Sequence, residues 1–265
     1  MSPARPSLSA AVIARDEAAH LGACLATLGF ADEVLVLVDA ATRDATREIA
    51  RAAGARVEER IFDTFAAQRD AALRLARGEW VLFVDADERV PPALRDEVLA
   101  RIAQPDGRRG FWIPRHNVLL GRVVRHAGWY PDYQLRLLER TAAHFDPRRV
   151  VHEVALLDGP AGHLEAAFVH YNYASLSEFV RKQERYSHLE ARRWRLTYGA
   201  PRRRALLGQP AREFWRRYIT LEGYREGPLG LLLSLLLAFY TAKAIWRASR
   251  LSMPLEQAPA AAPPT

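Results

Sequence analysis

Short, largely apolar runs alternate with amphipathic stretches through the first third of the chain. The runs cover residues 10–14, 33–38 and 81–84, and a more polar extended stretch covers 55–58. Apolar runs of this length, bounded by polar turns, are typical of strands that are buried on both faces of a parallel sheet. The alternation of strand and helix predicts an α/β fold with a mostly parallel sheet, flanking helices and right-handed crossovers.

Helical spacing is clear between these runs. Leu21, Cys24, Leu25 and Leu28 recur at i, i+3, i+4 and i+7, so we expect one buried face on which Cys24 packs rather than acts as a nucleophile. The sequence predicts further helices beginning near residue 44 and over 65–77, 93–103 and 175–198, and extended segments over 111–116, 133–138 and 150–154.

The C-terminal third contains a nearly unbroken apolar run over residues 229–242, followed by Lys243, Arg247 and Arg250. A membrane-spanning helix needs about 20 apolar residues, so a shorter run with a basic flank favours a helix that lies in the membrane interface or inserts in part. An ordinary core helix is the alternative. We therefore predict a catalytic domain over residues 8–170, a helical membrane-associating region over 171–252 and a disordered tail over 253–265.

The net positive charge of the chain indicates which binding partners are favoured. Among 265 residues, Lys and Arg number 38 and Asp and Glu 31, a net charge of +7 that suits a nucleotide, an acidic glycolipid or a membrane surface. Arginines cluster over residues 192–217, around Trp194 and close to the apolar run, where anionic lipid is a simpler partner than nucleic acid. We predict no nucleic-acid partner, and the single cysteine fits a reducing compartment.

Carboxylates follow the apolar run over residues 81–84. Asp85 and Asp87 stand one residue apart, and Glu88 comes next. Ligands of open α/β sheets bind beyond the carboxyl ends of the strands, and two carboxylates there suit Mg²⁺ or Mn²⁺ holding phosphate oxygens. A solvated turn or a helix N-cap is the alternative for an isolated acidic pair.

Further motifs follow one another in a specific order. They are Ala11-Val12-Ile13-Ala14-Arg15-Asp16-Glu17, then Val38-Asp39 with Thr42 and Asp44, then Gln68-Arg69-Asp70, and finally Gly78-Glu79-Trp80 leading to Asp85-Ala86-Asp87-Glu88-Arg89. In this order they resemble the nucleotide-sugar domain of family 2 glycosyltransferases, which have the Rossmann-like GT-A fold. Gly128 to Leu137 and Val151-His152-Glu153 resemble the lipopolysaccharide inner-core β-glucosyltransferase branch. Asp16 and Asp70 stand where the family usually has Asn, and Ala40-Ala41-Thr42-Arg43 where it has Ser-Gly-Ser-Thr.

The resemblance implies roles on the donor side of the site. Ala14, Glu17 and Asp39 would hold the base and ribose of a UDP-sugar, and Arg69 would face the diphosphate. Asp87 would ligate a divalent Mn or Mg ion, and Asp85 would contact the ribose or the metal. Glu17 as a first-turn helix carboxylate and Arg69 as a solvated helix arginine are the structural alternatives.

An inverting transfer also needs a base that takes the acceptor proton. We expect Asp132 in this role, with Glu153 as the second candidate and a simple turn residue as the structural alternative for Asp132. His152 is an additional candidate metal ligand or phosphate donor, unless it is a satisfied structural histidine. The predicted contacts to acceptor or phosphate are Trp129, Tyr130, Gln134 and Arg136.

The resemblance implies a hexosyltransferase that moves a hexose, glucose in this branch, onto a lipopolysaccharide core or another lipid-linked glycan at the cytoplasmic face of the bacterial inner membrane. A sugar-phosphate nucleotidyltransferase is one alternative, but it needs a Gly-rich basic loop where this chain has Arg15-Asp16-Glu17. A non-catalytic, membrane-associated glycolipid-binding scaffold is the other.

Overall fold

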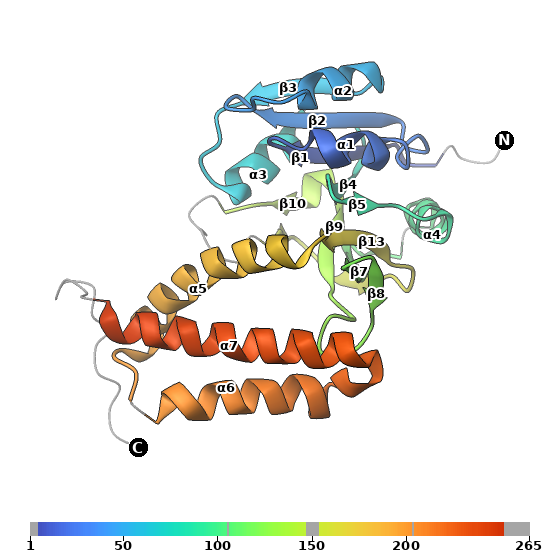
Figure 1. Ribbon diagram of the computed structural model, residues 1–265. Coiled ribbons are helices and arrows are strands. Elements are labelled where there is room, and N and C mark those ends of the chain that lie inside the picture. Colours follow the sequence, from blue (N-terminus) through green and yellow to red (C-terminus); the bar gives the residue numbers. More distant parts are fainter. Residues whose placement is uncertain (1–4, 105, 147–153, 203, 252–265) are drawn as a thin grey trace. The chain divides into compact units, whose positions relative to one another are not determined.

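The computed structural model describes residues 5–104, 106–146, 154–202 and 204–251 (Figure 1). The chain forms two compact units. The first comprises Met1–His116 and Pro131–Asn172, and the second comprises Asn117–Tyr130 and Tyr173–Thr265. The chain therefore leaves the first unit, contributes a short segment to the second and returns before it enters the helical part.

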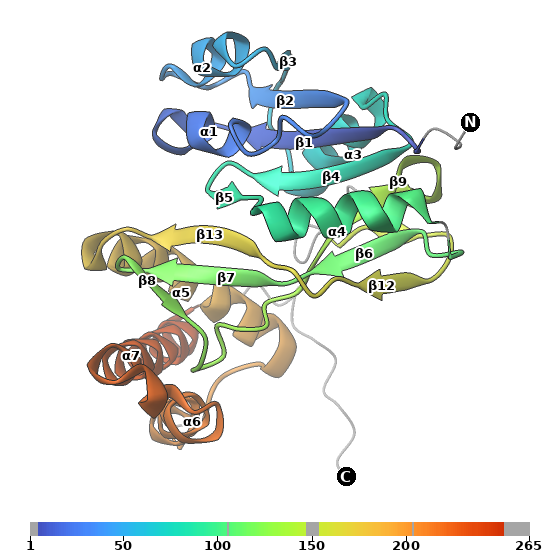
Figure 2. The ribbon, with the colours of Figure 1, turned by 90° about the vertical axis from the view of Figure 1, so that its right-hand side faces the viewer.

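A seven-stranded sheet with the strand order β12-β6-β9-β4-β1-β2-β3 forms the first unit. The strands β4, β1, β2 and β3 are parallel neighbours, whereas β9 runs antiparallel to both β4 and β6 (Figure 2). The mostly parallel α/β sheet is confirmed. The strand bounds are β1 Leu8–Ala14, β2 Glu33–Asp39, β3 Arg56–Arg60, β4 Trp80–Asp85, β6 Gly110–Ile113, β9 Gln134–Glu139 and β12 Ala161–His163.

Helices cover both faces of this sheet. Along β4, Leu82 and Val84 join the core beneath α1 and α4, while Val81 and Phe83 join the core beneath α3. This alternation explains why β4 is an unbroken apolar run. Cys24 is fully buried, and burial raises the pKa of its thiol to about 12, so it packs as predicted. The helices are α1 Ala18–Leu25, α2 Thr46–Ala52, α3 Phe65–Leu75 and α4 Pro92–Ala103.

Several short strands were not predicted. The most important pairing joins β5 to β13, antiparallel, with His170 opposite Glu88. The predicted strand over 111–116 is divided between β6 and β7, and most of the extended segment predicted over 150–154 lies outside the described residues. The short strands are β5 Glu88–Arg89, β7 Arg115–Leu119, β8 Arg122–Val124, β10 Ala143–His144, β11 Leu156–Leu157 and β13 Phe168–Tyr173.

Helices dominate the second unit. Ser175 caps α5 by accepting a hydrogen bond from the Glu178 backbone N–H at 3.2 Å. Helix α7 packs against α5 and α6. A Cβ on Gly230 of α7 would lie 1.9 Å from the backbone oxygen of Gly223, so this close approach requires glycine. The elements are α5 Leu176–Tyr198, α6 Ala205–Trp215, a π-helical turn Arg216–Thr220, a 3₁₀ turn Gly223–Glu226 and α7 Pro228–Arg250.

The long apolar helix extends beyond the run seen in the sequence, to Arg250. Glu184 of α5 explains the extension, because Lys243 Nζ donates to its carboxylate at 2.7 Å and Arg247 pairs with it as well. Lys243 and Arg247, two of the three basic residues of the predicted membrane-facing flank, thus form ion pairs with Glu184 of the same unit.

Candidate active site

The carboxyl ends of three adjacent parallel strands meet at one edge of the sheet. The register places Ala14 of β1 opposite Val38, and Ile13 opposite Asp85 of β4. Asp39 is the last residue of β2. The sequence-predicted residues Ala14, Asp39 and Asp85 therefore share one edge, where ligands of open α/β sheets bind.

Asp85 is held by two arginines. Arg136 of β9 donates to both carboxylate oxygens, one of them at 3.0 Å, and Arg69 of α3 donates at 3.3 Å. The Arg136 side chain is only 2% exposed, while that of Asp85 is 35% exposed. Burial alone raises the pKa of Asp85, but Arg136 and Arg69 outweigh it and hold the pKa below its usual range. Asp85 is therefore an ionised, fixed acceptor.

Glu88 lies beneath this pair and is fully buried. Its Oε2 accepts the Asp85 backbone N–H at 2.9 Å, and Arg115 Nη1 lies 3.3 Å from its Oε1. Burial, reinforced by the charge of Asp85, raises the pKa of Glu88 despite the nearby arginines. Glu88 thus stabilises the turn after β4, because its carboxylate accepts the backbone N–H of Asp85.

Arg115 links this cluster to Asp132. Its Nε donates to Asp132 Oδ2 at 2.9 Å, and Gln134 Nε2 donates to Asp132 Oδ1 at 3.0 Å. The candidate base is therefore oriented through both carboxylate oxygens. The described structure joins the predicted residues Arg69, Asp85, Asp132, Gln134 and Arg136 in one hydrogen-bonded network through Glu88 and Arg115.

Asp87 lies beside His170, which belongs to none of the motifs recognised in the sequence. The Nε2 of His170 is 3.3 Å from Asp87 Oδ2, and the Tyr171 backbone N–H donates to the Asp87 carbonyl at 2.9 Å. The β5–β13 pairing produces this contact. The alternation of Val, Tyr and Tyr with His and Asn over residues 169–173 is the sequence signal that could have predicted β13.

Asp87 and His170 fit a site for Mg²⁺ or Mn²⁺. No cluster of three or more Asp, Glu, His or Cys side chains suited to a metal occurs in the described part of the chain. Ions of this type are commonly held by one or two protein carboxylates together with substrate phosphates and water. The Asp87 carboxylate suits either ion, whereas the His170 imidazole suits a transition-metal ion such as Mn²⁺ better than Mg²⁺, which prefers oxygen ligands. His152 and Glu153 lie outside the described residues.

The loops after β1 and β2 carry the residues predicted to hold the nucleotide. Asp39 is 4% exposed, and its Oδ1 accepts the Ala41 backbone N–H at 3.0 Å. Its Oδ2 lies 3.1 Å from Arg15 Nη1 and accepts no hydrogen bond from any described residue. Asp16 has φ 53°, a left-handed conformation that Asp and Asn adopt more readily than other side chains, so Asp can replace the family's usual Asn here.

Glu17 begins α1 as its N-cap residue, and its backbone N–H donates to Thr46 Oγ1 at 2.8 Å. Asp44 accepts the backbone N–H groups of Ala18 at 2.9 Å and Thr46 at 3.0 Å, so one carboxylate joins the starts of α1 and α2. These contacts fix the loops that carry Glu17 and Asp39.

Trp129 and Tyr130 belong to the second unit. Within that unit the Trp129 ring packs edge-on against Tyr173 with centroids 6.3 Å apart, and the Arg217 guanidinium lies 6.0 Å from its ring centroid. Stacking of these rings on a sugar stays a prediction.

A parallel sheet with a carboxylate site at its strand ends is the architecture of a nucleotide-sugar transferase of the GT-A class. Residues 9–153 match the family model described as Glycosyl transferase family 2. The chain belongs to this family and is a glycosyltransferase, which decides against the nucleotidyltransferase and scaffold alternatives.

Relatives extend the match over nearly the whole chain. A lipopolysaccharide core biosynthesis glycosyltransferase, LpsC of Rhizobium meliloti (strain 1021), is 28% identical over 256 residues, which cover 93% of this chain and 94% of that protein.

Solved structures share the fold. S. aureus TarS 1-349 has a TM-score of 0.51 at 18% identity, with 92% of this chain and 89% of that chain covered. The mannosyltransferase PcManGT from Pyrobaculum calidifontis has a TM-score of 0.51 at 16% identity, covering 97% and 78%. The predicted GT-A fold is confirmed.

Proposed function

We propose that this glycosyltransferase moves a hexose from a UDP-sugar, with inversion at C1, onto a lipopolysaccharide core or another lipid-linked glycan. The observation that carries the proposal is the gathering of Asp39, Asp85 and Asp87 at one end of β2 and β4, with His170 beside Asp87. Similarity to LpsC along nearly the whole chain supports the choice of acceptor class.

The geometry of the strand ends supports donor binding at this edge of the sheet. The buried Oδ2 of Asp39 is an acceptor suited to a ribose hydroxyl, and Ala14 lies at the end of the neighbouring strand. Arg69 and Arg136 fix Asp85 for a further ribose or metal contact and bring positive charge toward the diphosphate.

A divalent cation would be held by Asp87 and His170, with Asp85 nearby. When bound, such an ion neutralises the charge that develops on the leaving diphosphate. The PcManGT structure is described in complex with GDP-Man and Mn²⁺, which supports a nucleotide-sugar donor and a divalent ion for this fold.

Asp132 is the base in this proposal. It takes the acceptor hydroxyl proton while that oxygen forms a bond to C1 and the bond from C1 to the diphosphate oxygen breaks. Arg115 and Gln134 orient its carboxylate so that no reorganisation is needed during the transfer. Glu153 is the second candidate for this role.

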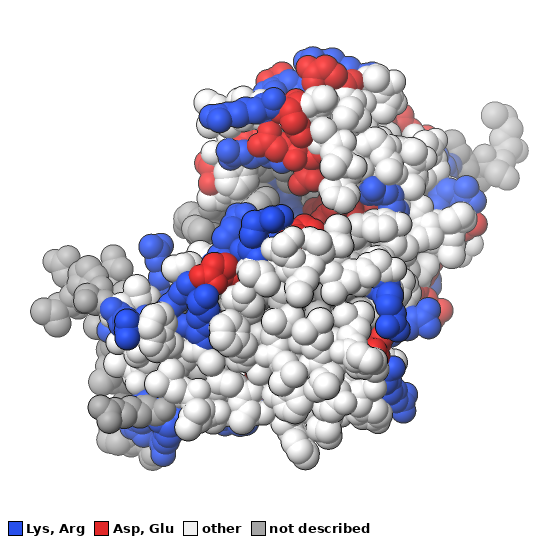
Figure 3. All heavy atoms as spheres, viewed as in Figure 1, with Lys and Arg blue, Asp and Glu red and all other residues white. Residues whose placement is uncertain are grey.

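We also propose that the second unit associates with the cytoplasmic face of the inner membrane. Helix α7 is long and apolar enough to cross a membrane, with a mean hydropathy of 1.7, yet 39% of that window is buried by the protein. Its exposed apolar side chains are Leu231, Leu232, Leu235, Phe239 and Trp246. Figure 3 shows a broad surface over α6 and α7 with Lys and Arg only at its margins. A helix partly buried in its own unit favours interfacial association over spanning.

A binding panel tests the donor and the metal together. Thermal unfolding of the detergent-solubilised protein is measured with UDP, GDP, CDP and dTDP, each with Mn²⁺ and with EDTA. A nucleotide at 100 times its dissociation constant stabilises by about 2.7 kcal/mol, a clear shift. We expect stabilisation by UDP with Mn²⁺ only. Selectivity for GDP would overturn the donor assignment, and no response to any nucleotide would overturn the donor site.

A further inference from the structure

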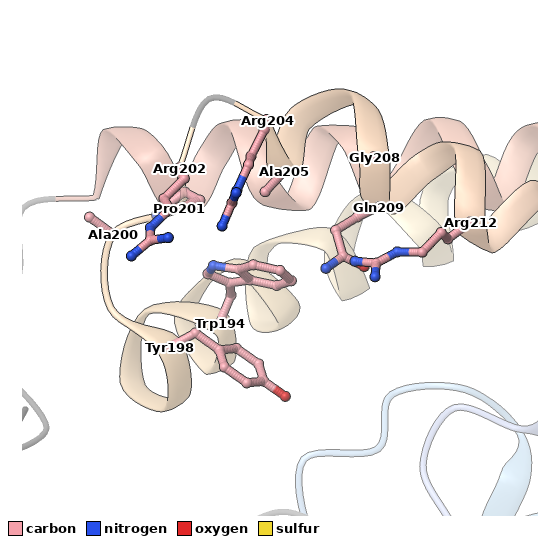
Figure 4. Close-up of a pocket in the computed structure, with 10 residues that line it drawn as sticks. All are labelled: Trp194, Tyr198, Ala200, Pro201, Arg202, Arg204, Ala205, Gly208, Gln209 and Arg212. Carbon is pink, nitrogen blue, oxygen red and sulfur yellow. The ribbon is translucent and has the colours of Figure 1, made fainter. Parts of the chain in front are cut away.

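A cavity of about 700 Å³ opens between α5 and the start of α6, wholly within the second unit. Trp194 and Tyr198 come from α5, and Arg202 and Arg204 from the segment that precedes α6. In Figure 4 these arginines approach the Trp194 indole from one side, while the side chains of Gln209 and Arg212 approach it from the other. No described Asp or Glu lines the cavity. It is therefore cationic around an aromatic centre.

These arginines have no carboxylate counterion among the residues that the structure describes. Arg202, Arg204 and Arg212 form no ion pair with any carboxylate in the described ranges. Arg216 and Arg217, a few residues further along, both pair with Glu213. An arginine fork matches the geometry of phosphate oxygens, so three unpaired forks around one cavity suit an oxyanion.

The start of α6 adds to this potential. Arg204 is its N-cap residue, no side chain caps it, and no acidic residue lies in its first turn. Ala205 and Gly208, from its first turns, line the cavity. The unneutralised positive end of the helix dipole therefore faces the same space as the arginines and favours an anion there.

The aromatic residues of the cavity suit an organic ligand that carries a phosphate better than an inorganic ion alone. The Trp194 and Tyr198 rings lie 5.0 Å apart, and the buried Nε1 of Trp194 has no hydrogen-bond partner among the described residues. An indole face suits the apolar face of a sugar ring, and its Nε1–H and the Gln209 amide are neutral donors for hydroxyl groups. Phosphate and sugar features thus occur together.

We propose that this cavity, formed entirely by residues of the second unit, is a binding site for a phosphorylated saccharide. The arginines and the start of α6 hold the phosphate, and Trp194 carries the sugar. The phosphate can belong to the headgroup of a saccharide lipid or to a soluble sugar phosphate. The inference rests on the second unit alone and does not depend on the proposed donor.

Gly208 provides a matched pair of test variants. A Cβ at this position meets nothing within 4 Å, so a side chain fits without disturbing the helix. Gly208→Glu places a carboxylate at the cavity, and Gly208→Gln places a neutral side chain of the same size there. A second pair consists of two double variants. The test variant combines Arg202→Gln with Arg212→Gln. The control combines Arg216→Gln with Arg225→Gln, because these two arginines pair with Glu213 and Glu222 and do not line the cavity.

Binding of glucose 1-phosphate is measured by calorimetry, and binding to phosphatidylcholine vesicles is measured with and without a phosphorylated glycolipid. We expect Gly208→Glu and the Arg202/Arg212 double variant to weaken binding of the phosphorylated probe about tenfold or more, because charge-assisted hydrogen bonds are lost. Gly208→Gln and the control double variant should remain within about threefold of the original chain.

The two probes separate the sources of the phosphate. A variant-sensitive response to glucose 1-phosphate assigns the site to soluble sugar phosphates, and a response confined to glycolipid vesicles assigns it to a membrane headgroup. Equal effects of Gly208→Glu and Gly208→Gln, equal effects of the two double variants, or no binding of either probe by folded protein would overturn the proposal. Transfer activity is not the readout, so failure here leaves the proposed function standing.

Discussion

The two units of the molecule treat charge in opposite ways. In the first, Arg136 and Glu88 are buried, and each forms ion pairs with side chains on neighbouring elements. In the second, α7 exposes Leu235 and Phe239, and the three arginines that line the Trp194 cavity form no ion pair with a described carboxylate. The first unit therefore holds its charged side chains in fixed positions, whereas the second presents apolar and cationic surfaces of the kind that bind other molecules.

Removing Arg136 should give the largest effect. Arg136→Leu leaves Asp85 and the fully buried Glu88 without their shared counterion, and breaking a buried ion pair costs about 3–5 kcal/mol of unfolding free energy. Urea denaturation measures this loss. Arg95→Leu, which removes an exposed arginine paired with Asp96, is the control and should cost less than about 1 kcal/mol. Equal losses in both variants would show that the network contributes no more than a surface pair.

Asp87→Ala should leave the protein folded and reduce transfer about 10²–10³-fold, because it removes a proposed ligand for the ion that stabilises the leaving diphosphate. Turnover of UDP-hexose by the variant and its thermal midpoint are measured together. Asp96→Ala removes an exposed carboxylate from α4 and should keep full turnover.

His170→Ala sharpens this test of the metal site. If His170 shares the ion with Asp87, the variant should need more Mn²⁺ for half-maximal turnover, about tenfold or more. Unchanged Mn²⁺ dependence together with normal turnover would remove His170 from the metal site and return it to a structural role.

Helix α7 provides a test of the opposite unit. Leu235→Glu places a charge on its exposed apolar side and should weaken partitioning onto anionic vesicles roughly tenfold, since charged side chains are strongly disfavoured in the bilayer. Ile61→Glu makes a comparable change at an exposed apolar position of the first unit and should have little effect. Equal effects of the two variants in a vesicle sedimentation assay would contradict interfacial binding by α7.

Local patterns predicted the parts of the fold that local physics controls. The buried strand β4, its terminal carboxylates and the helix that begins after Ser175 all follow from residues close together in sequence. The contact of His170 with Asp87 did not, because it depends on the pairing of β5 with β13 across a long sequence separation. Arg115 was missed for the same reason: its partners Glu88 and Asp132 come from different segments.

The limits of local patterns are equally clear in the second unit. Lys243 and Arg247 formed a basic flank in the sequence, and an anionic membrane was the nearest explanation. Their carboxylate partner, Glu184, lies on α5, so only the packing of two helices reveals the pairing. Helix α6 was not predicted, because it contains Pro210 and buries none of its side chains fully.

The pH dependence of stability gives the smallest and most specific test. The raised pKa of Glu88 means that the folded chain binds its proton more tightly than the unfolded chain does. This group therefore contributes stability that is complete below its ordinary pKa of 4.5 and is lost as the pH rises through the folded value. Asp85 has a lowered pKa, so its contribution to stability is present above its ordinary pKa of 3.8 and is lost as the pH falls through the folded value.

Glu88→Gln should remove the Glu88 contribution, so the unfolding free energy of the variant should fall less steeply than that of the original chain as the pH rises above 4.5. Denaturant unfolding at a series of pH values measures the two slopes. Glu190→Gln changes an exposed glutamate on α5 that pairs with Arg193 and should leave the slope as it is. A Glu88→Gln slope identical to that of the original chain would show that Glu88 is ionised in the folded protein at no cost. The arginines Arg115 and Arg136 would then neutralise it fully, and the first unit would hold its buried charges without any penalty from burial.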